Sequence, residues 1–292
     1  MNAIETRKLT KFYGESRGII DLDLEVGEGE FFGFIGPNGA GKSTTIRTLM
    51  GLITATSGEA EVLGLNVNKN RQQILERVGY LPSEVAYYNG MRVKEIIDFS
   101  LKLRGRSFDS EAKTLVERFD LDISRKVEEL SLGNRKKVGI VCALAHRPDL
   151  YILDEPTSGL DPLMQREFYN ALEERCTEGA TVFLSSHVLS EVSRYCKRAA
   201  VIREGRLIKA DSVERLGHTG VKRVSLKGLK ELSETENISN IKIDGDTTSF
   251  LFGGGSSELI SALSRLSFDD FSVTDPELDE VFMHFYREDE EK

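Results

Sequence analysis

Apolar and polar positions follow different periods along this chain. Residues 1–85 carry short apolar or alternating runs, such as IETRKLTKFY, IIDLDLEV and EFFGFIG, and glycines interrupt them. Runs of this kind predict β-strands, and the last of them leads into a helix that starts near Gly41. From Val93 to about Arg118 the apolar residues recur at near-helical spacing, which predicts a helical insertion.

The α/β pattern returns in residues 149–210. DLYILDEP and ATVFLSSH are apolar runs typical of buried parallel strands, and a helix-like stretch from Pro162 to Arg175 separates them. The prediction is a parallel sheet covered on both faces. After about Gly217, VKRVSLKG, NIKIDG and TTSFLFGG alternate as hairpin strands do before an amphipathic SSELISALSRL, which predicts a small α+β appendage.

Composition narrows the class of protein. The 292 residues, 39% hydrophobic and 30% charged, suit one large domain plus a small appendage, and the net charge of −9 argues against a nucleic-acid partner. Cys142, Cys176 and Cys196 are widely spaced and odd in number, so we expect neither a disulfide framework nor a paired-cysteine zinc site. This cysteine content predicts that the protein works in a reducing cytoplasm. The N-terminal residues contain no apolar run of the kind a signal peptide has, and no later stretch approaches 18 apolar residues. We therefore expect no membrane span.

A phosphate-binding loop follows the apolar run FFGFI. The segment GPNGAGKS at residues 36–43 fits the pattern G-x-x-x-x-G-K-[ST], in which backbone N–H groups wrap phosphates at a helix N-terminus. Lys42 is expected to neutralise phosphate oxygens and Ser43 to ligate Mg²⁺. The residues expected around the nucleotide phosphates are Gly36, Pro37, Asn38, Gly39, Ala40, Gly41, Lys42, Ser43 and Thr44. The loop by itself does not separate kinases, GTPases and transport ATPases.

Two adjacent acids end the apolar strand at residues 149–156. An acid at the carboxyl end of a strand faces the ligand crevice of an open α/β sheet, so Asp154 is expected to hold Mg²⁺ through water. Glu155 would then sit beside the γ-phosphate and polarise the attacking water as general base. The pair predicts hydrolysis of a nucleoside triphosphate.

With these motifs the chain resembles the ATP-binding subunits of ABC transporters over roughly residues 1–215. The resemblance implies an α/β fold: a P-loop (RecA-like) ABC ATPase core with an antiparallel β subdomain, a helical subdomain near residues 86–145 and a small C-terminal α+β accessory domain. It places the ATPase domain at residues 1–216 and the accessory domain at 217–292. ATP and Mg²⁺ are the expected ligands.

The resemblance implies roles in nucleotide binding and hydrolysis for two further residues. It implies that Tyr13 stacks on the adenine, although an ordinary tyrosine at a strand edge is the alternative. It implies that His187, which follows the apolar strand TVFLSS, senses the γ-phosphate in catalysis. A satisfied core histidine is the alternative there, but placement at a strand end favours the phosphate-facing role.

The resemblance also implies a dimer. Residues 130–134 correspond to the signature motif and residues 158–161, ending at Asp161, to the D-loop. In the family two subunits pack head to tail, so Ser131 and Gly133 of one subunit contact the γ-phosphate held by the other. Ser131 can also cap the helix that begins there.

Two motifs depart from the family pattern. Leu132 replaces the first Gly of Leu-Ser-Gly-Gly-Gln and Asn134 replaces its Gln, which points to a branch of exporters. At the Q-loop, Ser83 stands where the family has Gln, so the amide that would reach Mg²⁺ is missing. Ser83 by its hydroxyl and Glu84 by its carboxylate are the alternative metal ligands.

The C-terminal region resembles the branch that exports drugs, polyketides, lipids or peptides. Its segment at 275–282 starts with Asp275 as a helix cap and Pro276 at the first position. The resemblance implies two partners: an integral membrane permease, and a second ATPase that is either another copy of this chain or a paralogue. It also implies that the chain works at the cytoplasmic face of the membrane. Tyr88 lies in a turn-rich, aromatic segment after the Q-loop that forms either a permease-binding surface or part of the core.

The sequence argues against two other classes of ABC protein. ABC proteins of DNA repair or chromosome structure separate the two phosphate motifs by a long coiled coil, whereas Lys42 and Asp154 lie only 112 residues apart here without a heptad run. Ribosome-associated ABC factors normally carry two cassettes and basic segments. The signature motif, the D-loop and His187 together argue against a kinase or GTPase.

Overall fold

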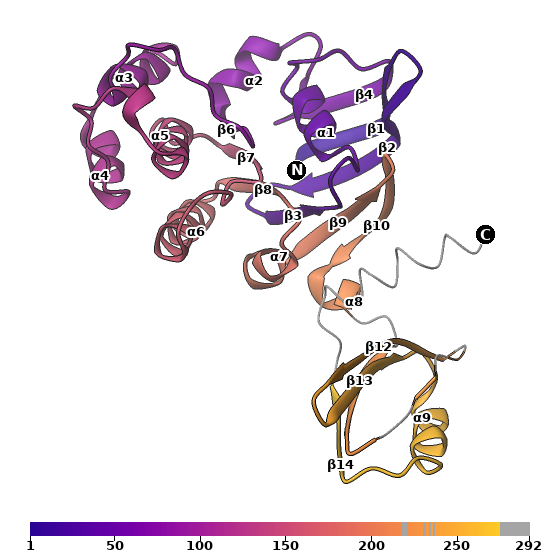
Figure 1. Ribbon diagram of the computed structural model, residues 1–292. Coiled ribbons are helices and arrows are strands. Elements are labelled where there is room, and N and C mark those ends of the chain that lie inside the picture. Colours follow the sequence, from indigo (N-terminus) through magenta and orange to yellow (C-terminus); the bar gives the residue numbers. More distant parts are fainter. Residues whose placement is uncertain (218–220, 230–231, 234, 236, 275–292) are drawn as a thin grey trace. The chain divides into compact units, whose positions relative to one another are not determined.

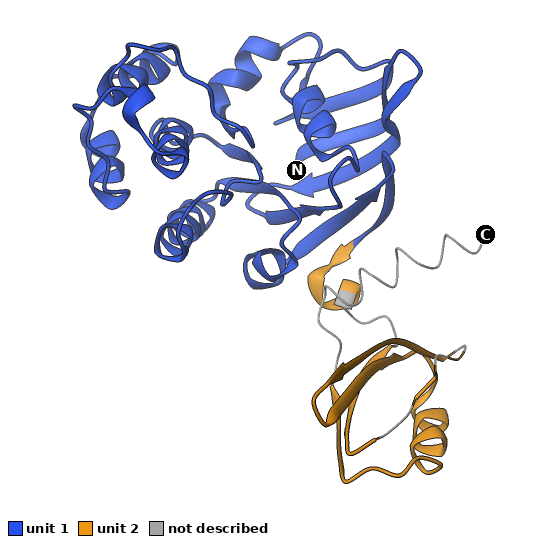
Figure 2. Cartoon of the chain, viewed as in Figure 1, with its two compact units in different colours: residues 1–210 blue, residues 211–292 orange. Residues whose placement is uncertain are grey.

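The computed structural model describes all of the chain except residues 218–220, 230–231, 234, 236 and 275–292. It divides into two compact units, Met1–Ala210 and Asp211–Lys292 (Figures 1 and 2). Each unit is described by itself. Among the described residues, no helix has both the length and the apolar character needed to cross a membrane.

The first unit opens with a four-stranded antiparallel sheet in the order β2-β1-β4-β5. Its strands are β1 (Asn2–Tyr13), β2 (Ser16–Gly27), β4 (Ser57–Val62) and β5 (Leu65–Asn66). Alternate residues of β2, including Leu22, Leu24 and Val26, are buried, while the residues between them are exposed or half-buried. This two-residue period puts one face of the sheet on the core.

A six-stranded sheet in the order β10-β9-β3-β8-β7-β6 forms the centre of the unit. Its strands are β3 (Phe31–Ile35), β6 (Val78–Leu81), β7 (Leu150–Asp154), β8 (Thr181–Ser186), β9 (Arg198–Arg203) and β10 (Arg206–Ser212). Neighbours from β9 to β6 pair in parallel. The expectation of a purely parallel sheet was wrong at one edge, because only two residues join β9 to β10 and so short a connection requires antiparallel strands.

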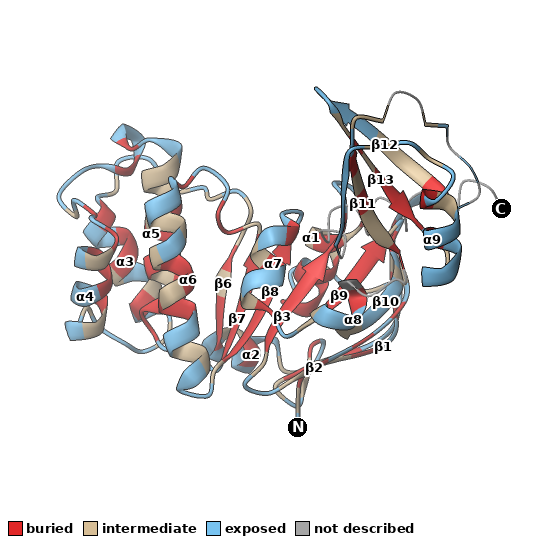
Figure 3. Ribbon diagram, turned by 90° about the horizontal axis from the view of Figure 1, so that it is seen from below, coloured by how far each residue is buried: buried red, intermediate tan, exposed pale blue. Residues whose placement is uncertain are grey.

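Helices cover both faces of this central sheet. They are α1 (Lys42–Leu49), α2 (Arg71–Arg77), α6 (Pro162–Thr177) and α7 (Leu189–Tyr195). One hydrophobic core joins the two sheets through α1 and α2, while α6 and α7 contact strands β3 and β8. Strands β3, β7 and β8 of the central sheet are buried along their whole length (Figure 3), whereas the edge strand β10 has no fully buried residue.

A helical segment is inserted between β6 and β7. It contains α3 (Val93–Lys102), α4 (Ser110–Arg118), a 3₁₀ turn (Val127–Glu129) and α5 (Leu132–Leu144). The side chain of Asp109 caps α4 by accepting from the Ala112 N–H at 3.1 Å. Helices α3 and α4 both contact α5, and α5 in turn contacts the edge strand β6. This insertion occupies the helical stretch that the sequence predicts.

The second unit is a four-stranded antiparallel sheet in the order β12-β13-β11-β14 with one helix on it. Its elements are α8 (Val213–Gly217), β11 (Lys222–Lys227), β12 (Ile238–Asp244), β13 (Thr247–Phe252), α9 (Ser256–Leu263) and β14 (Asp270–Thr274). Leu259 and Leu263 of α9 join the core of this sheet. The helix start expected at Asp275 lies outside the described residues.

Candidate functional site

The phosphate-binding loop joins the end of β3 to the start of α1. Gly41 precedes the helix with a φ of 108°, and an added Cβ would lie 2.8 Å from the Gly18 carbonyl oxygen, so the position requires glycine. No side chain caps this helix N-terminus. The N–H groups at this helix N-terminus are therefore free of side-chain caps and can bind a phosphate. Of the predicted loop residues, Gly36, Ala40 and Lys42 are buried, Ser43 and Thr44 are half-buried, and Pro37, Asn38 and Gly39 are exposed.

Lys42 points its ammonium group across the loop. The nitrogen donates to the carbonyl oxygens of Gly36 at 2.6 Å and Pro37 at 3.1 Å. It also lies 3.4 Å from Oε1 of Glu155, and the lysine side chain is only 5% exposed. The lysine of the loop and the second acid of β7, which are far apart in sequence, therefore form one ion pair.

The two acids stand at the carboxyl edge of β7. Asp154 is buried and accepts a hydrogen bond from the Ser185 hydroxyl at 3.1 Å, across the parallel pair of β7 and β8. Glu155 has a φ of 46°, a left-handed conformation that costs about 1–2 kcal/mol for a residue with a side chain. Its N–H donates to the Ser185 carbonyl at 3.0 Å. Backbone strain at Glu155 is typical of functional sites.

His187 lies directly after β8 and faces the same glutamate. Its Nδ1 is 3.2 Å from Oε1 of Glu155, and half of the side chain is exposed. The turn is fixed by Ser186, whose hydroxyl donates to Glu191 at 2.8 Å and accepts from the Val188 N–H at 2.9 Å. One oxygen of Glu155 thus lies between the imidazole and the ammonium group of Lys42.

The signature residues lie at the N-terminus of α5. Ser131 caps the helix, as predicted, by accepting from the Asn134 N–H at 3.3 Å. An added Cβ on Gly133 would lie 2.6 Å from the Gly159 carbonyl oxygen, so only glycine permits this close approach to the D-loop. Asp161 caps α6 by accepting from the Met164 N–H at 3.0 Å.

The signature residues are remote from the phosphate loop of the same chain. Helix α5 packs on the edge strand β6, whereas the loop follows β3, and β8 and β7 lie between these two strands (Figure 1). Leu132 beside the signature glycine is 67% exposed. The structure therefore gathers the predicted site residues into two groups, one around the loop and one around α5.

Tyr13 is the last residue of β1 and lies near the start of α1. Its side chain is 45% exposed, and the Lys11 ammonium nitrogen lies 5.3 Å from the ring centroid. A Cβ on Gly18 would come within 3.1 Å of the tyrosine ring and 2.9 Å of the Thr44 methyl group. The ring and the first turn of α1 therefore flank the same glycine.

The residue that sequence reasoning missed is Lys136 on α5. It is 1% exposed, and its ammonium group donates to the carbonyl oxygens of Pro82 at 3.0 Å, Ser83 at 2.9 Å and Glu155 at 3.1 Å. Burial lowers the pKa of Lys136 to about 8, and the carboxylates of Asp154 and Glu155 oppose that shift. The signal was available, because Lys136 falls four positions before the buried Ile140 and so on the apolar face of the helix.

The oxygen donors at this edge fit a magnesium ion. Ser43 offers a hydroxyl at the start of α1 and Asp154 offers a buried carboxylate at the end of β7. Mg²⁺ prefers few protein oxygens and leaves its other positions to water and phosphate. Among the described residues, no group of three or more His, Cys, Asp or Glu side chains would hold a metal without such a phosphate.

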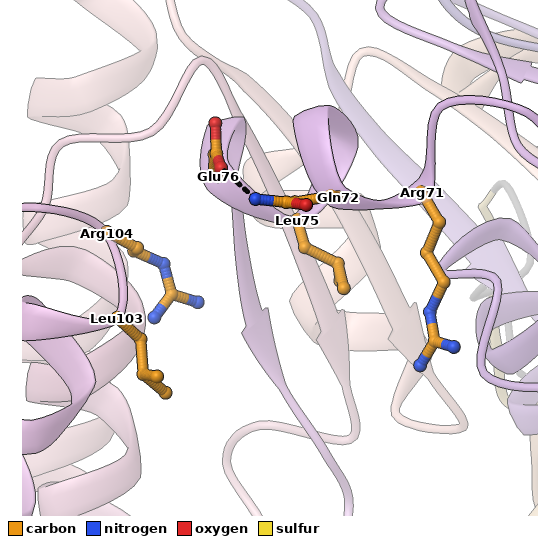
Figure 4. Close-up of a pocket in the computed structure, with 6 residues that line it drawn as sticks. All are labelled: Arg71, Gln72, Leu75, Glu76, Leu103 and Arg104. Carbon is orange, nitrogen blue, oxygen red and sulfur yellow. Dashed lines mark hydrogen bonds between the residues drawn. The ribbon is translucent and has the colours of Figure 1, made fainter.

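A separate pocket of about 360 Å³ opens beside α2, away from these residues (Figure 4). It combines apolar and charged side chains: Arg71, Gln72, Leu75, Glu76, Leu103 and Arg104. Gln72 donates to Glu76 at 3.1 Å, while Leu103, which follows α3, is 66% exposed. None of the residues that line this pocket belongs to the group around Lys42 and Glu155.

Tyr87 and Tyr88 near the Q-loop have different environments. Tyr88 is 79% exposed. Tyr87 is half-buried, and its hydroxyl donates to the Arg135 carbonyl on α5 at 3.1 Å. Only Tyr88 is available on the surface.

Comparisons with known proteins place the chain among similar sequences and structures. A family model described as ABC transporter matches residues 19–158. Bacitracin transport ATP-binding protein BcrA of Bacillus licheniformis is 39% identical over 212 residues, covering 70% of this chain and 68% of that protein. Uncharacterized ABC transporter ATP-binding protein YhaQ of Bacillus subtilis (strain 168) is 31% identical over 287 residues, covering 94% of this chain and 95% of that protein. A solved ATP-binding subunit of an ABC transporter superposes with a TM-score of 0.69 at 30% identity, covering 73% of this chain and 91% of that chain.

Proposed function

The chain belongs to the ABC transporter family as an ATP-binding subunit with ATPase activity, and on this premise we propose that it drives a separate membrane permease that exports amphipathic peptides, drugs or lipids. ATP-binding subunits of this family work with membrane permeases and dimerise. The name of the Bacillus licheniformis relative, a bacitracin transport protein, supports export of a peptide or drug. The chain then acts at the cytoplasmic face of the membrane.

One observation carries the hydrolytic mechanism: Oε1 of Glu155 lies 3.4 Å from the Lys42 ammonium nitrogen. Lys42 binds the β- and γ-phosphates of ATP, so a carboxylate beside it is within reach of the water that attacks the γ-phosphate. Glu155 accepts the proton of that water as general base. His187, 3.2 Å from the same oxygen, holds the glutamate and responds to the γ-phosphate.

The remaining residues of the loop bind and orient the nucleotide. The backbone N–H groups of residues 36–44, except Pro37, which has none, enclose the phosphates, and Tyr13 stacks on the adenine. Ser43 and Asp154 would hold Mg²⁺, and Ser83 would be a further oxygen ligand in place of the usual glutamine. When bound, the ion neutralises charge on the phosphate oxygens.

A second copy of the chain or a paralogous ATPase completes each site. Ser131 and Gly133 lie at the N-terminus of α5, remote from the phosphate loop of their own chain, and Ser131 and Asp161 are exposed. That separation supports a head-to-tail pair in which these residues meet the ATP held by the partner. Binding of ATP then favours the closed pair, and hydrolysis releases it.

We assign residues 1–216 to the ATPase domain and 217–292 to an accessory domain, which the division of the structure between Ala210 and Asp211 supports. The permease binds on the segment inserted between β6 and β7, where Tyr88 is 79% exposed. An exposed aromatic residue of this kind suits contact with a short helix of a partner protein.

The variant Glu155→Gln tests the proposal, because the amide keeps the shape of the side chain but cannot accept a proton. We expect turnover to fall about 100- to 10,000-fold while ATP still binds, and the variant to form a dimer in ATP and Mg²⁺ that size-exclusion chromatography detects. Glu173→Gln, at an exposed position on α6, is the matched control. Phosphate release by Glu155→Gln at the rate of the control would refute the general-base assignment.

A further inference from the structure

A single buried ammonium group joins three segments of the ATPase unit. Lys136 lies in α5, and its nitrogen donates to Pro82 and Ser83 after β6 and to Glu155 after β7, at 2.9–3.1 Å. An ammonium group has three donors, so all three are taken by backbone carbonyls. A lysine that is 1% exposed is rare unless its charge is fully paired in this way.

The contact with Glu155 falls on a strained peptide. Glu155 has a φ of 46°, and such a conformation persists only where the surrounding structure holds it. The N–H of Glu155 donates to the Ser185 carbonyl at 3.0 Å, and its C=O accepts from Lys136 at 3.1 Å and from the Ser158 N–H at 3.4 Å. The orientation of the two peptide groups that flank Glu155 sets the direction of the carboxylate toward Lys42 and His187.

The other two bonds tie this peptide to the loop that leads into the helical segment. Pro82 and Ser83 follow β6 immediately, and α3 begins ten residues later at Val93. The helix that carries Lys136 starts at the signature cap, Ser131. A displacement of α5 or of the loop is therefore transmitted to the Glu155 carbonyl through one nitrogen atom.

We infer that Lys136 is a positioning residue for hydrolysis: its ammonium group holds the Glu155 peptide in the orientation that aims the carboxylate at the attacking water, and couples that orientation to the loop at residues 82–83. This inference rests on the proposed role of Glu155 as general base. The three acceptors of Lys136 all lie outside the phosphate-binding loop at residues 36–44. Lys136 thus acts on the chemical step and not on nucleotide affinity.

The test is Lys136→Met in the full chain, since methionine fills the space of the lysine stem but donates no hydrogen bond. We expect kcat to fall about 10- to 100-fold while KM and the affinity for a fluorescent ATP analogue change less than about threefold. Lys137→Met removes a charge from the neighbouring, half-buried position and is the control, with activity close to wild type. If Lys136→Met does not fold, Lys136→Gln, which keeps amide donors, replaces it in the same assays.

Two outcomes would overturn the inference. A folded Lys136→Met protein with kcat within twofold of wild type would show that the bonds do not position Glu155. Loss of ATP affinity together with a lowered melting temperature would show a purely structural role.

A double-variant cycle separates this inference from the proposed function. If Lys136 acts through Glu155, Lys136→Met lowers single-turnover hydrolysis in the wild-type background but not in the Glu155→Gln background. Equal losses in both backgrounds would refute the coupling while leaving the ATPase function intact. If Glu155→Gln alone hydrolyses ATP normally, the general-base proposal fails first.

Discussion

Acidification should destabilise the ATPase unit through His146, which follows α5. The side chain is 3% exposed, and its Nε2 lies 3.3 Å from the Val78 carbonyl oxygen on β6. Among the described residues, Nδ1 of His146 has no hydrogen-bond partner. Burial, with the nearby charge of Arg104, lowers the pKa of His146 to about 4, so the folded protein holds the ring neutral.

The size of the effect follows from proton linkage. An unfolded histidine has a pKa of about 6.5, so as the pH falls the unfolded chain takes up the proton first and folding stability is lost between pH 6.5 and about 4. Relative to pH 7, this single group removes about 1 kcal/mol of the free energy of unfolding at pH 5.5 and about 2 kcal/mol at pH 4.5. The contribution is fully present above pH 6.5.

Urea unfolding followed by circular dichroism at pH 7.0, 6.0 and 5.5 would measure this loss in the wild type and in His146→Gln. Glutamine can donate to the Val78 carbonyl but does not titrate, so between pH 7.0 and 5.5 the free energy of unfolding of the variant should decline by about 1 kcal/mol less than that of the wild type. All other groups are common to both proteins and cancel in the comparison. Parallel declines in the two proteins would refute the assignment of a depressed pKa to His146.

Other predictions concern nucleotide and permease binding. Lys42→Ala should weaken binding of a fluorescent ATP analogue by about tenfold or more and lower turnover with it, because the phosphates lose their main counter-charge; unchanged affinity would mean that the loop is not the nucleotide site. Tyr88→Ala, at a position 79% exposed, should leave the melting temperature and basal hydrolysis unchanged while reducing co-purification with the permease. The half-buried Tyr87 is the contrast, since Tyr87→Ala should cost about 3 kcal/mol of folding stability; a destabilised Tyr88→Ala that still binds the permease would contradict the surface role.

The sequence predicts well those parts of the molecule whose structure depends on nearby residues. The strand FFGFI, the glycine-rich loop and the helix after Gly41 are contiguous, and the structure contains all three in that order. Apolar runs also mark β7 and β8, because both faces of these strands are buried and most of their residues are apolar. The two acids after β7 could be recognised for the same reason, since the strand before them is continuous.

Features that depend on distant contacts were missed. The strand β14 reads DFSVT with all five residues exposed, so no buried face produces an alternating pattern, and its pairing with β11 determines it. Lys136 has acceptors 53, 54 and 19 positions away along the chain, and only the tertiary fold brings these carbonyls to one nitrogen. The antiparallel β10 likewise depends on a two-residue turn, which apolar patterning does not reveal.

The left-handed backbone at Glu155 has a consequence for how this position evolves. Glycine would adopt a φ of 46° without steric penalty, and selection for stability alone would favour it there. A carboxylate is retained in spite of about 1–2 kcal/mol of local strain, as expected where activity opposes stability. Screens that enrich thermostable variants of such ATPases should therefore accumulate substitutions at this residue that fold better and no longer turn over.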